Sequence, residues 1–381
     1  MERHKYERHK YERLVESLQK NADKLYINGL EIEVRNCEGR EAGRPDPANE
    51  AAGRVTREDF ASYRERLAPQ LWANEVHLLG PQGATELSRL EYLRAQFGWT
   101  SSDVSTGIRT ICHRMTVAGE PFRLYQYEVL SAETDRPCLL YIHGGGFFGG
   151  DIATLENQCK LLAQLSGGVV CSVDYPLCPE HPYPAGADAC YEALQWIHAH
   201  ASELGISREK VGIAGDSAGG NLALACALRD REQGGGRIAY QALLYPVVDM
   251  RERIDSSPYW DRQMYDNPYD DPLIEAQIRM VGEQLADIAA WYVPAGTDVC
   301  QPCLSPILAE LDGLPRTLMI TVEYDFLRGS CEAFSRKLQA AGVETRHIRY
   351  GGCGHGVFDR LGYAPQADDM VREIAADLLR L

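Results

Sequence analysis

Short, mostly apolar runs recur through the C-terminal part of the chain. They are Cys138–Ile142, Val169–Val173, Val211–Ala214, Ala242–Tyr245 and Leu318–Val322. Runs of this kind are typical of strands buried on both faces, and segments with helical spacing separate them, at Ala187–Leu204 and Ala218–Leu228. Because strand–helix–strand alternation needs crossover connections, the pattern predicts an α/β fold with a mostly parallel central sheet flanked by helices. Ile108–Met115 and Phe122–Val129 alternate between apolar and polar residues, which predicts an antiparallel edge.

The chain divides into three regions by composition. Residues 1–104 are charged and mostly helical in pattern, and we expect them to form an N-terminal arm and cap helices. Residues 105–381 carry the strand–helix alternation and are predicted to form a second domain, interrupted at about 250–302 by a segment without strand pattern. A long segment of this kind inside a compact domain is usually functional, so we expect a lid or cap. Within the N-terminal region, Asn28-Gly29 predicts a hairpin turn.

The first helix of the N-terminal region carries one apolar stripe. Tyr11, Leu14, Val15 and Leu18 follow helical spacing. A helix of this length is marginal alone in water, so it must dock to persist. It can dock on its own cap or on a neighbouring subunit, or it can fray. We expect subunit contact, and hence a homodimer or higher homo-oligomer formed through the N-terminal arm.

Composition narrows the class of protein. The 381 residues carry a formal net charge of −16, and a surface this acidic repels nucleic acid. We find no apolar stretch of ~18 residues and no N-terminal apolar segment, so we expect no membrane association, no secretory signal and a cytoplasmic location. Cys300 and Cys303 have CxxC spacing, but a second well-spaced pair is missing. The sequence therefore predicts no metal and no cofactor.

A GxSxG motif lies between a predicted strand and a predicted helix. It reads Gly215-Asp216-Ser217-Ala218-Gly219 and directly follows Val211–Ala214. Small residues on both sides allow a sharp strand-to-helix turn that exposes the serine hydroxyl. We therefore expect Ser217 to be a nucleophile.

A second glycine-rich motif, His143-Gly144-Gly145-Gly146, follows the strand Cys138–Ile142. Glycines let backbone N–H groups approach a substrate and point at a developing oxyanion. We expect Gly144, Gly145 and Ala218 to form the oxyanion hole. The neighbouring positions His143, Gly146, Phe147 and Asp216 are predicted to bind substrate, with His143 supporting the loop rather than reacting.

The serine needs a base, and the base needs an orienting carboxylate. In the expected order both lie downstream of Ser217, where the histidines are His347 and His355. His347 lies within a strand-like run, whereas His355 lies in a glycine-rich loop that can reach the site, so we favour His355. The candidate acids are Asp249, Asp298, Asp312, Glu323 and Asp325. Asp325 follows a strand end, and Glu323 is its close rival.

Several further blocks accompany these motifs in order. They are Asp174-Tyr175-Pro176-Leu177-Cys178-Pro179-Glu180-His181-Pro182, Leu244-Tyr245-Pro246, Ser305-Pro306, Glu323-Tyr324-Asp325-Phe326-Leu327-Arg328 and His355-Gly356-Val357-Phe358. Together with HGGG and GDSAGG they resemble the hormone-sensitive lipase family of α/β-hydrolases, in its bacterial carboxylesterase and acetyl esterase branch. The resemblance runs from about Val104 to Leu381 and implies an α/β-hydrolase fold with a helical cap. It also implies Asp325 as the acid.

The resemblance implies a serine carboxylesterase acting on short-chain acyl esters, acetyl to butyryl, through an acyl-enzyme. The partner would then be a small-molecule ester. An alternative function with the same catalytic chemistry is that of an amidase, lactonase or carbamate hydrolase that uses the same three residues. An alternative from a different functional class is a non-catalytic receptor for a small molecule, and the loss of a triad residue would indicate such a receptor. All three residues are present in this chain.

Overall fold

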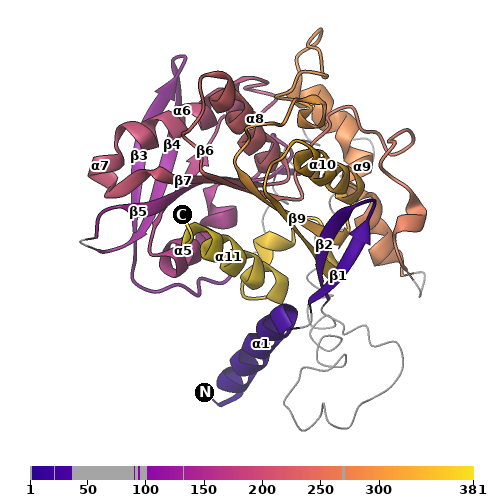
Figure 1. Ribbon diagram of the computed structural model, residues 1–381, viewed down its shortest axis with the longest axis horizontal. Helices are drawn as coiled ribbons and strands as arrows, with labels where there is room; N and C mark the ends of the chain where they lie inside the picture. The colour runs from indigo at the N-terminus through magenta and orange to yellow at the C-terminus, as the bar shows by residue number, and fades with distance from the viewer. Residues whose placement is uncertain are drawn as a thin grey trace.

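The computed structural model describes residues 2–20, 22–36, 90, 93–94, 101–131, 133–267 and 271–381. Its strands form one ten-stranded sheet in the order β1-β2-β10-β9-β8-β7-β5-β6-β4-β3 (Figure 1). The strands are β1 (Ala22–Ile27), β2 (Leu30–Arg35), β3 (Ile108–Val117), β4 (Glu120–Val129), β5 (Arg136–Ile142), β6 (Val169–Asp174), β7 (Ile206–Asp216), β8 (Tyr240–Leu244), β9 (Arg316–Tyr324) and β10 (Thr345–Gly354). The six central strands, β10, β9, β8, β7, β5 and β6 in sheet order, are parallel to one another. β4 and β3 continue the sheet beyond β6 as the predicted antiparallel edge. The α/β fold predicted from the apolar runs is confirmed.

Helices cover both faces of this sheet. The helices are α5 (Ile152–Ser166) and α11 (Pro365–Leu378) on one face, and α6 (Ala185–Ala199), α7 (Ala201–Leu204), α8 (Ala218–Glu232) and α10 (Arg328–Ala340) on the other. In β5, Leu140 and Ile142 pack into the core beneath α6, α8 and α10, whereas Leu139 and Tyr141 pack into the core beneath α5 and α11. Both faces are therefore apolar, which is why the strand reads as an unbroken run.

Part of the N-terminal region belongs to the central sheet. β1 and β2 form a hairpin, and Asn28 and Gly29 at its turn have φ of 49° and 85°, as a two-residue hairpin turn requires. β2 pairs in parallel with β10, more than 300 residues away along the chain. Residues 22–35 thus extend the central sheet, which differs from the predicted division at residue 104. The reason is that β10 offers a free parallel edge to which the hairpin adds.

The first helix, α1 (Glu2–Lys20), contacts α11 of its own chain, with its C-terminal end next to α11 (Figure 1). Leu14 and Leu18 are fully buried within the chain, and the Tyr11 hydroxyl donates to the Ala364 carbonyl at 3.2 Å. The apolar stripe is therefore covered within the chain and is not free for a partner. The homo-oligomer stays a prediction, and any subunit contact made by α1 would have to use its other faces.

The interrupting segment contains a long helix. α9 (Pro272–Tyr292) lies between β8 and β9 in sequence, after the short helix η1 (Arg262–Met264). Its buried positions Ile274, Ile278, Val281 and Leu285 follow helical spacing. The cap helices predicted within residues 1–104 lie, after residue 36, outside the described residues except at residues 90 and 93–94, where Leu90 and Leu93 are helical and buried.

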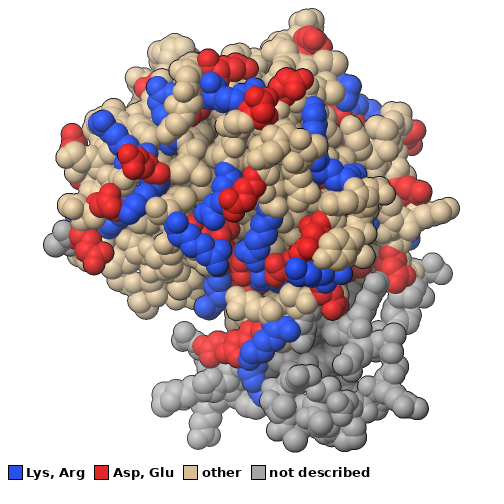
Figure 2. Space-filling view, in the orientation of Figure 1, with Lys and Arg blue, Asp and Glu red and all other residues tan. Residues whose placement is uncertain are grey.

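The described part of the chain contains no helix long and apolar enough to cross a membrane. On the face shown in Figure 2, basic and acidic side chains are interleaved rather than gathered by sign. Charged side chains also pair across elements: Arg346 pairs with Glu33 of β2 and with Glu373 of α11.

Candidate active site

Ser217 lies at a sharp turn between β7 and α8. Its backbone has φ 53° and ψ −118°, a strained conformation for a residue with a side chain. Glycine is required on both sides: a Cβ at Gly215 would lie 2.3 Å from the Gly219 carbonyl oxygen, and one at Gly219 would lie 2.1 Å from that of Ile142. The Ser217 N–H donates to the Leu244 carbonyl at 2.9 Å, which ties the turn to the end of β8. The turn therefore holds the hydroxyl out from the sheet, as the motif predicts.

His355 joins the serine to a carboxylate. Its Nε2 lies 2.8 Å from Ser217 Oγ, and its Nδ1 lies 2.8 Å from Asp325 Oδ2. Asp325 follows β9 and is fully buried, whereas His355 follows β10 and its side chain is 11% exposed. Asp325 Oδ1 also accepts the Leu327 N–H at 3.0 Å, which fixes the carboxylate. The structure therefore brings together Ser217, His355 and Asp325 in hydrogen-bonding order.

The rival residues have other partners. Glu323 accepts the Gly352 N–H at 2.8 Å and so holds the loop that carries His355. Asp249 pairs with Arg251 at 2.7 Å, and Asp298 accepts the Cys300 N–H at 2.9 Å.

His347 is a buried structural residue. It lies between the hydroxyls of Thr321 and Ser335, at 2.9 and 2.8 Å. Burial, with Arg349 and Arg336 nearby, lowers its pKa to about 3. The imidazole is therefore neutral and remote from the serine, as expected of a strand position.

The HGGG loop follows β5, and its accessible part is Gly145 and Gly146. Gly145 has φ 115°, and a Cβ there would lie 2.1 Å from the Gly149 carbonyl oxygen, so only glycine fits. The Gly144 N–H donates to Asp216 Oδ1 at 2.9 Å, which differs from its predicted part in an oxyanion hole. The reason is tertiary: Asp216 is buried directly beneath the loop. Within the described residues, the N–H groups of Gly145 and Ala218 have no hydrogen-bond acceptor.

The four residues predicted to bind substrate divide into one accessible and three buried positions. Gly146 is partly exposed, whereas His143, Phe147 and Asp216 are at most 4% exposed. The His143 ring stacks on Tyr175 at 4.4 Å, and the Phe147 ring stacks on Tyr292 of α9 at 3.8 Å. These three side chains therefore shape the loop from beneath and do not present a surface to a substrate.

Asp216 bridges the serine turn to the HGGG loop. Besides the Gly144 N–H, its Oδ1 accepts the Tyr141 hydroxyl at 3.0 Å. Burial raises the pKa of Asp216 to about 6, although these two hydrogen bonds oppose the shift. The residue next to the nucleophile in sequence thus also fixes the start of the loop.

Three contributions from outside the motifs were not predicted. The C-terminal end of α9 lies against the HGGG loop, through Tyr292 and through Trp291, whose ring meets Phe148 edge-on at 4.9 Å. The Tyr245 ring lies 4.8 Å from the His355 ring. Arg94 reaches the loop from the N-terminal region. Tyr245 belongs to the Leu244-Tyr245-Pro246 block that we noted, whereas no local signal marked Trp291, Tyr292 or Arg94.

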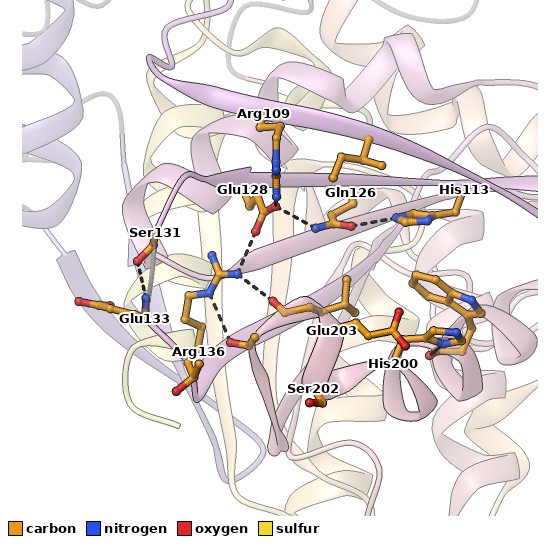
Figure 3. Close-up of a pocket in the computed structure, with 15 residues that line it drawn as sticks. Arg109, His113, Gln126, Glu128, Ser131, Glu133, Arg136, His200, Ser202 and Glu203 are labelled. Carbon is orange, nitrogen blue, oxygen red and sulfur yellow. Dashed lines mark hydrogen bonds and ion pairs between the residues drawn. The ribbon is translucent and has the colours of Figure 1, made fainter.

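A depression of about 580 Å³ lies at the opposite end of β5, by the β3–β4 edge and α6–α7 (Figure 3). Glu128 at its centre receives hydrogen bonds from Arg109, Gln126 and Arg136, and Arg136 also donates to the Leu204 carbonyl. Because its buried charges neutralise one another, this depression has a structural explanation. No group of three or more metal-ligating side chains occurs among the described residues, Cys300 and Cys303 included.

Comparisons with known proteins identify the family of this chain. A model of the family described as the alpha/beta hydrolase fold matches residues 139–359, more than half of the chain. Carboxylesterase NlhH of Mycobacterium tuberculosis is 34% identical over 230 residues, which cover 59% of this chain and 67% of that protein. Ethyl acetate hydrolase of Pseudomonas putida is 32% identical over 247 residues, which cover 64% of this chain and 72% of that protein.

Among solved structures, the esterase of Pyrobaculum calidifontis superposes with a TM-score of 0.63 at 34% identity, covering 71% of this chain and 85% of that one. The family match spans β6 to β10, the HGGG loop, the serine turn and the loop of His355, which are the elements that build the site. The chain therefore belongs to the α/β-hydrolase fold family, in its hormone-sensitive lipase branch.

Proposed function

We propose that this carboxylic ester hydrolase works through an acyl-enzyme formed on Ser217. The observation that carries the proposal is His355, whose two ring nitrogens each lie 2.8 Å from their partners, Ser217 Oγ and Asp325 Oδ2. Ser217 Oγ attacks the ester carbonyl while His355 Nε2 takes its proton. The Asp325 carboxylate accepts from Nδ1–H, holds the ring and stabilises the imidazolium that forms.

The second half of the reaction regenerates the serine. His355 returns the proton to the leaving alcohol as the tetrahedral intermediate collapses to the acyl-enzyme. Water then attacks the acyl carbonyl, with His355 again taking the proton, and the carboxylic acid leaves. We assign the oxyanion contacts to the N–H groups of Gly145 and Ala218. Gly144 has a different part, because its N–H holds the loop on Asp216.

We further propose that the substrates are short-chain esters. Support comes from the aromatic side chains packed around the HGGG loop, since Phe147 and Phe148 are both buried against the end of α9. The similarity to an ethyl acetate hydrolase points the same way. The cytoplasmic location remains a prediction from the sequence.

We expect acetyl to butyryl esters of p-nitrophenol to be hydrolysed with higher kcat/KM than esters of ten or more carbons. The reason is that Phe147 and Phe148 are buried against α9, so their rings are not available to receive a long chain. The measurement is kcat/KM across acyl lengths at one detergent concentration. Equal or higher values for long chains would contradict the short-chain proposal, and preferential turnover of amides, lactones or carbamates would identify the alternative reaction.

We expect an organophosphonate with a p-nitrophenol leaving group to add one phosphonyl group per chain, on Ser217. Its phosphorus accepts the same activated oxygen as an ester carbonyl, and the adduct resembles the tetrahedral intermediate. Intact-mass and peptide mass spectrometry locate the label. A label on another residue, or activity that survives complete labelling, would overturn the proposed nucleophile.

A further inference from the structure

Arg94 joins the N-terminal region to two loops of the catalytic domain. Its Nε donates to the Phe148 carbonyl at 2.7 Å, and its Nη2 donates to the Cys178 carbonyl at 2.8 Å. Nη1 and Nη2 also pair with the two carboxylate oxygens of Glu180, at 2.7 and 2.6 Å. Arg94 lies before residues 139–359, the stretch that matches the family, so the contact is made from outside it.

The two carbonyl groups belong to the segments that shape the HGGG loop. Phe148 and Gly149 turn back on the loop, because their N–H groups donate to the Gly145 carbonyl at 3.2 and 2.8 Å. The second segment is tied to the first by the Cys178 N–H, which donates to the Phe147 carbonyl at 3.0 Å. The guanidinium of Arg94 therefore connects the turn that follows Gly145 with the segment that contains Cys178.

The shape of the guanidinium matters more here than its charge. The side chains of Arg94 and Glu180 are 28% and 52% exposed, and ion pairs at such exposure contribute little. Hydrogen bonds from Arg94 nevertheless lower the pKa of Glu180 to about 2, against the effect of desolvation. The planar fork presents donors to both carbonyls and to the carboxylate at once, whereas an ammonium group is a compact point charge that cannot span them.

We propose that Arg94 is a positioning residue that sets the Gly145 N–H for the oxyanion. It touches neither substrate nor the reacting atoms, and it acts through the carbonyl of Phe148. The proposal rests on the proposed function, since it needs an oxyanion at Gly145. If the Gly145 N–H is displaced, it stabilises the transition state less, while binding of the ester in the ground state is largely unchanged.

The test compares Arg94→Lys and Arg94→Met with the wild-type protein on p-nitrophenyl acetate. We expect kcat to fall about 10- to 100-fold, since a donor displaced by about an ångström costs up to that much, and KM to change less than about threefold. A trifluoromethyl ketone, which forms a tetrahedral oxyanion on the serine, should lose affinity in parallel with kcat. A purely structural role would not move that affinity in step with kcat.

Two further variants isolate the tether. Glu180→Gln keeps both carbonyl contacts of Arg94 and should change kcat less than about threefold. Arg231→Met is the matched control, because Arg231 also donates to two backbone carbonyls, of Glu310 at 2.6 Å and Asp312 at 3.1 Å, on another loop. If Arg94→Met does not fold, Arg94→Lys carries the test.

Unchanged kcat in Arg94→Lys, or a rise in KM alone, would overturn the positioning role. An equal loss in Arg231→Met would do the same, because the effect would then not be specific to the HGGG loop. Failure of the proposed function has a separate signature: Ser217→Ala would keep its activity, whatever the Arg94 variants do.

Discussion

Ser217→Ala is expected to lower kcat on p-nitrophenyl acetate by at least ~10⁴-fold. The substitution removes the one oxygen that lies 2.8 Å from His355 Nε2, so the acyl-enzyme can no longer form. The fold should persist, because the strained turn is held by backbone hydrogen bonds such as that from the Ser217 N–H to Leu244. Steady-state kinetics and the thermal midpoint together measure the two effects.

The histidines supply the controls for this experiment. His355→Ala should be nearly as inactive as Ser217→Ala, and the double variant should be no worse, because the two groups act as one unit. His347→Gln should retain turnover, since His347 contacts Thr321 and Ser335 and is remote from the serine. Activity that survives in Ser217→Ala, or that is lost in His347→Gln at an unchanged midpoint, would contradict the assignment.

Arg35→Ala should destabilise the protein by about 3–5 kcal/mol, the cost of leaving a buried charge without its partner. Arg35, at the end of β2, is 4% exposed and pairs with Asp369 and Glu373 of α11 at 2.5 and 2.8 Å. Asp369 is fully buried and also accepts the Tyr350 hydroxyl of β10 and the Gln19 amide of α1, both at 2.8 Å. Burial raises the pKa of Asp369 and Arg35 opposes that shift, so removing Arg35 leaves the carboxylate uncompensated.

Urea unfolding measures this loss. Arg35→Ala combined with Asp369→Asn should recover part of it, because the amide carries no charge to bury. Arg380→Ala removes a pair with Asp377 in which the arginine side chain is 63% exposed. Because the buried Asp377 keeps its contacts with Tyr240 and Arg316, this variant should cost less than about 1 kcal/mol. A loss below about 1 kcal/mol in Arg35→Ala would mean that the N-terminal hairpin is an appendage of the sheet and not a part of it.

The sequence alone indicated the elements whose signals are local. The strand β5 is an apolar run because both of its faces are covered, and the turn at Ser217 needs small residues within two positions on either side. His355 was distinguished from His347 by its glycine-rich surroundings, whereas the choice of Asp325 over Glu323 came from the resemblance of a whole block. In each case the relevant pattern lies within a few neighbouring residues, so periodicity and the residue types of the turn are enough to predict the element.

The tertiary structure decided which distant groups meet. Gly144 donates to Asp216 rather than to a substrate oxyanion, across 72 positions of sequence, and Arg94 reaches the carbonyl of Phe148 across 54. The helix α1 packs against α11 of its own chain, and the Tyr11 hydroxyl donates to the Ala364 carbonyl, 353 positions away. The sequence shows that an apolar stripe or a free strand edge must be covered by another part of the molecule. It does not show which part covers it, because the shape and charge of the covering surface come from residues that are distant in the sequence. That is why the pairing of β2 with β10 had no counterpart in the local pattern.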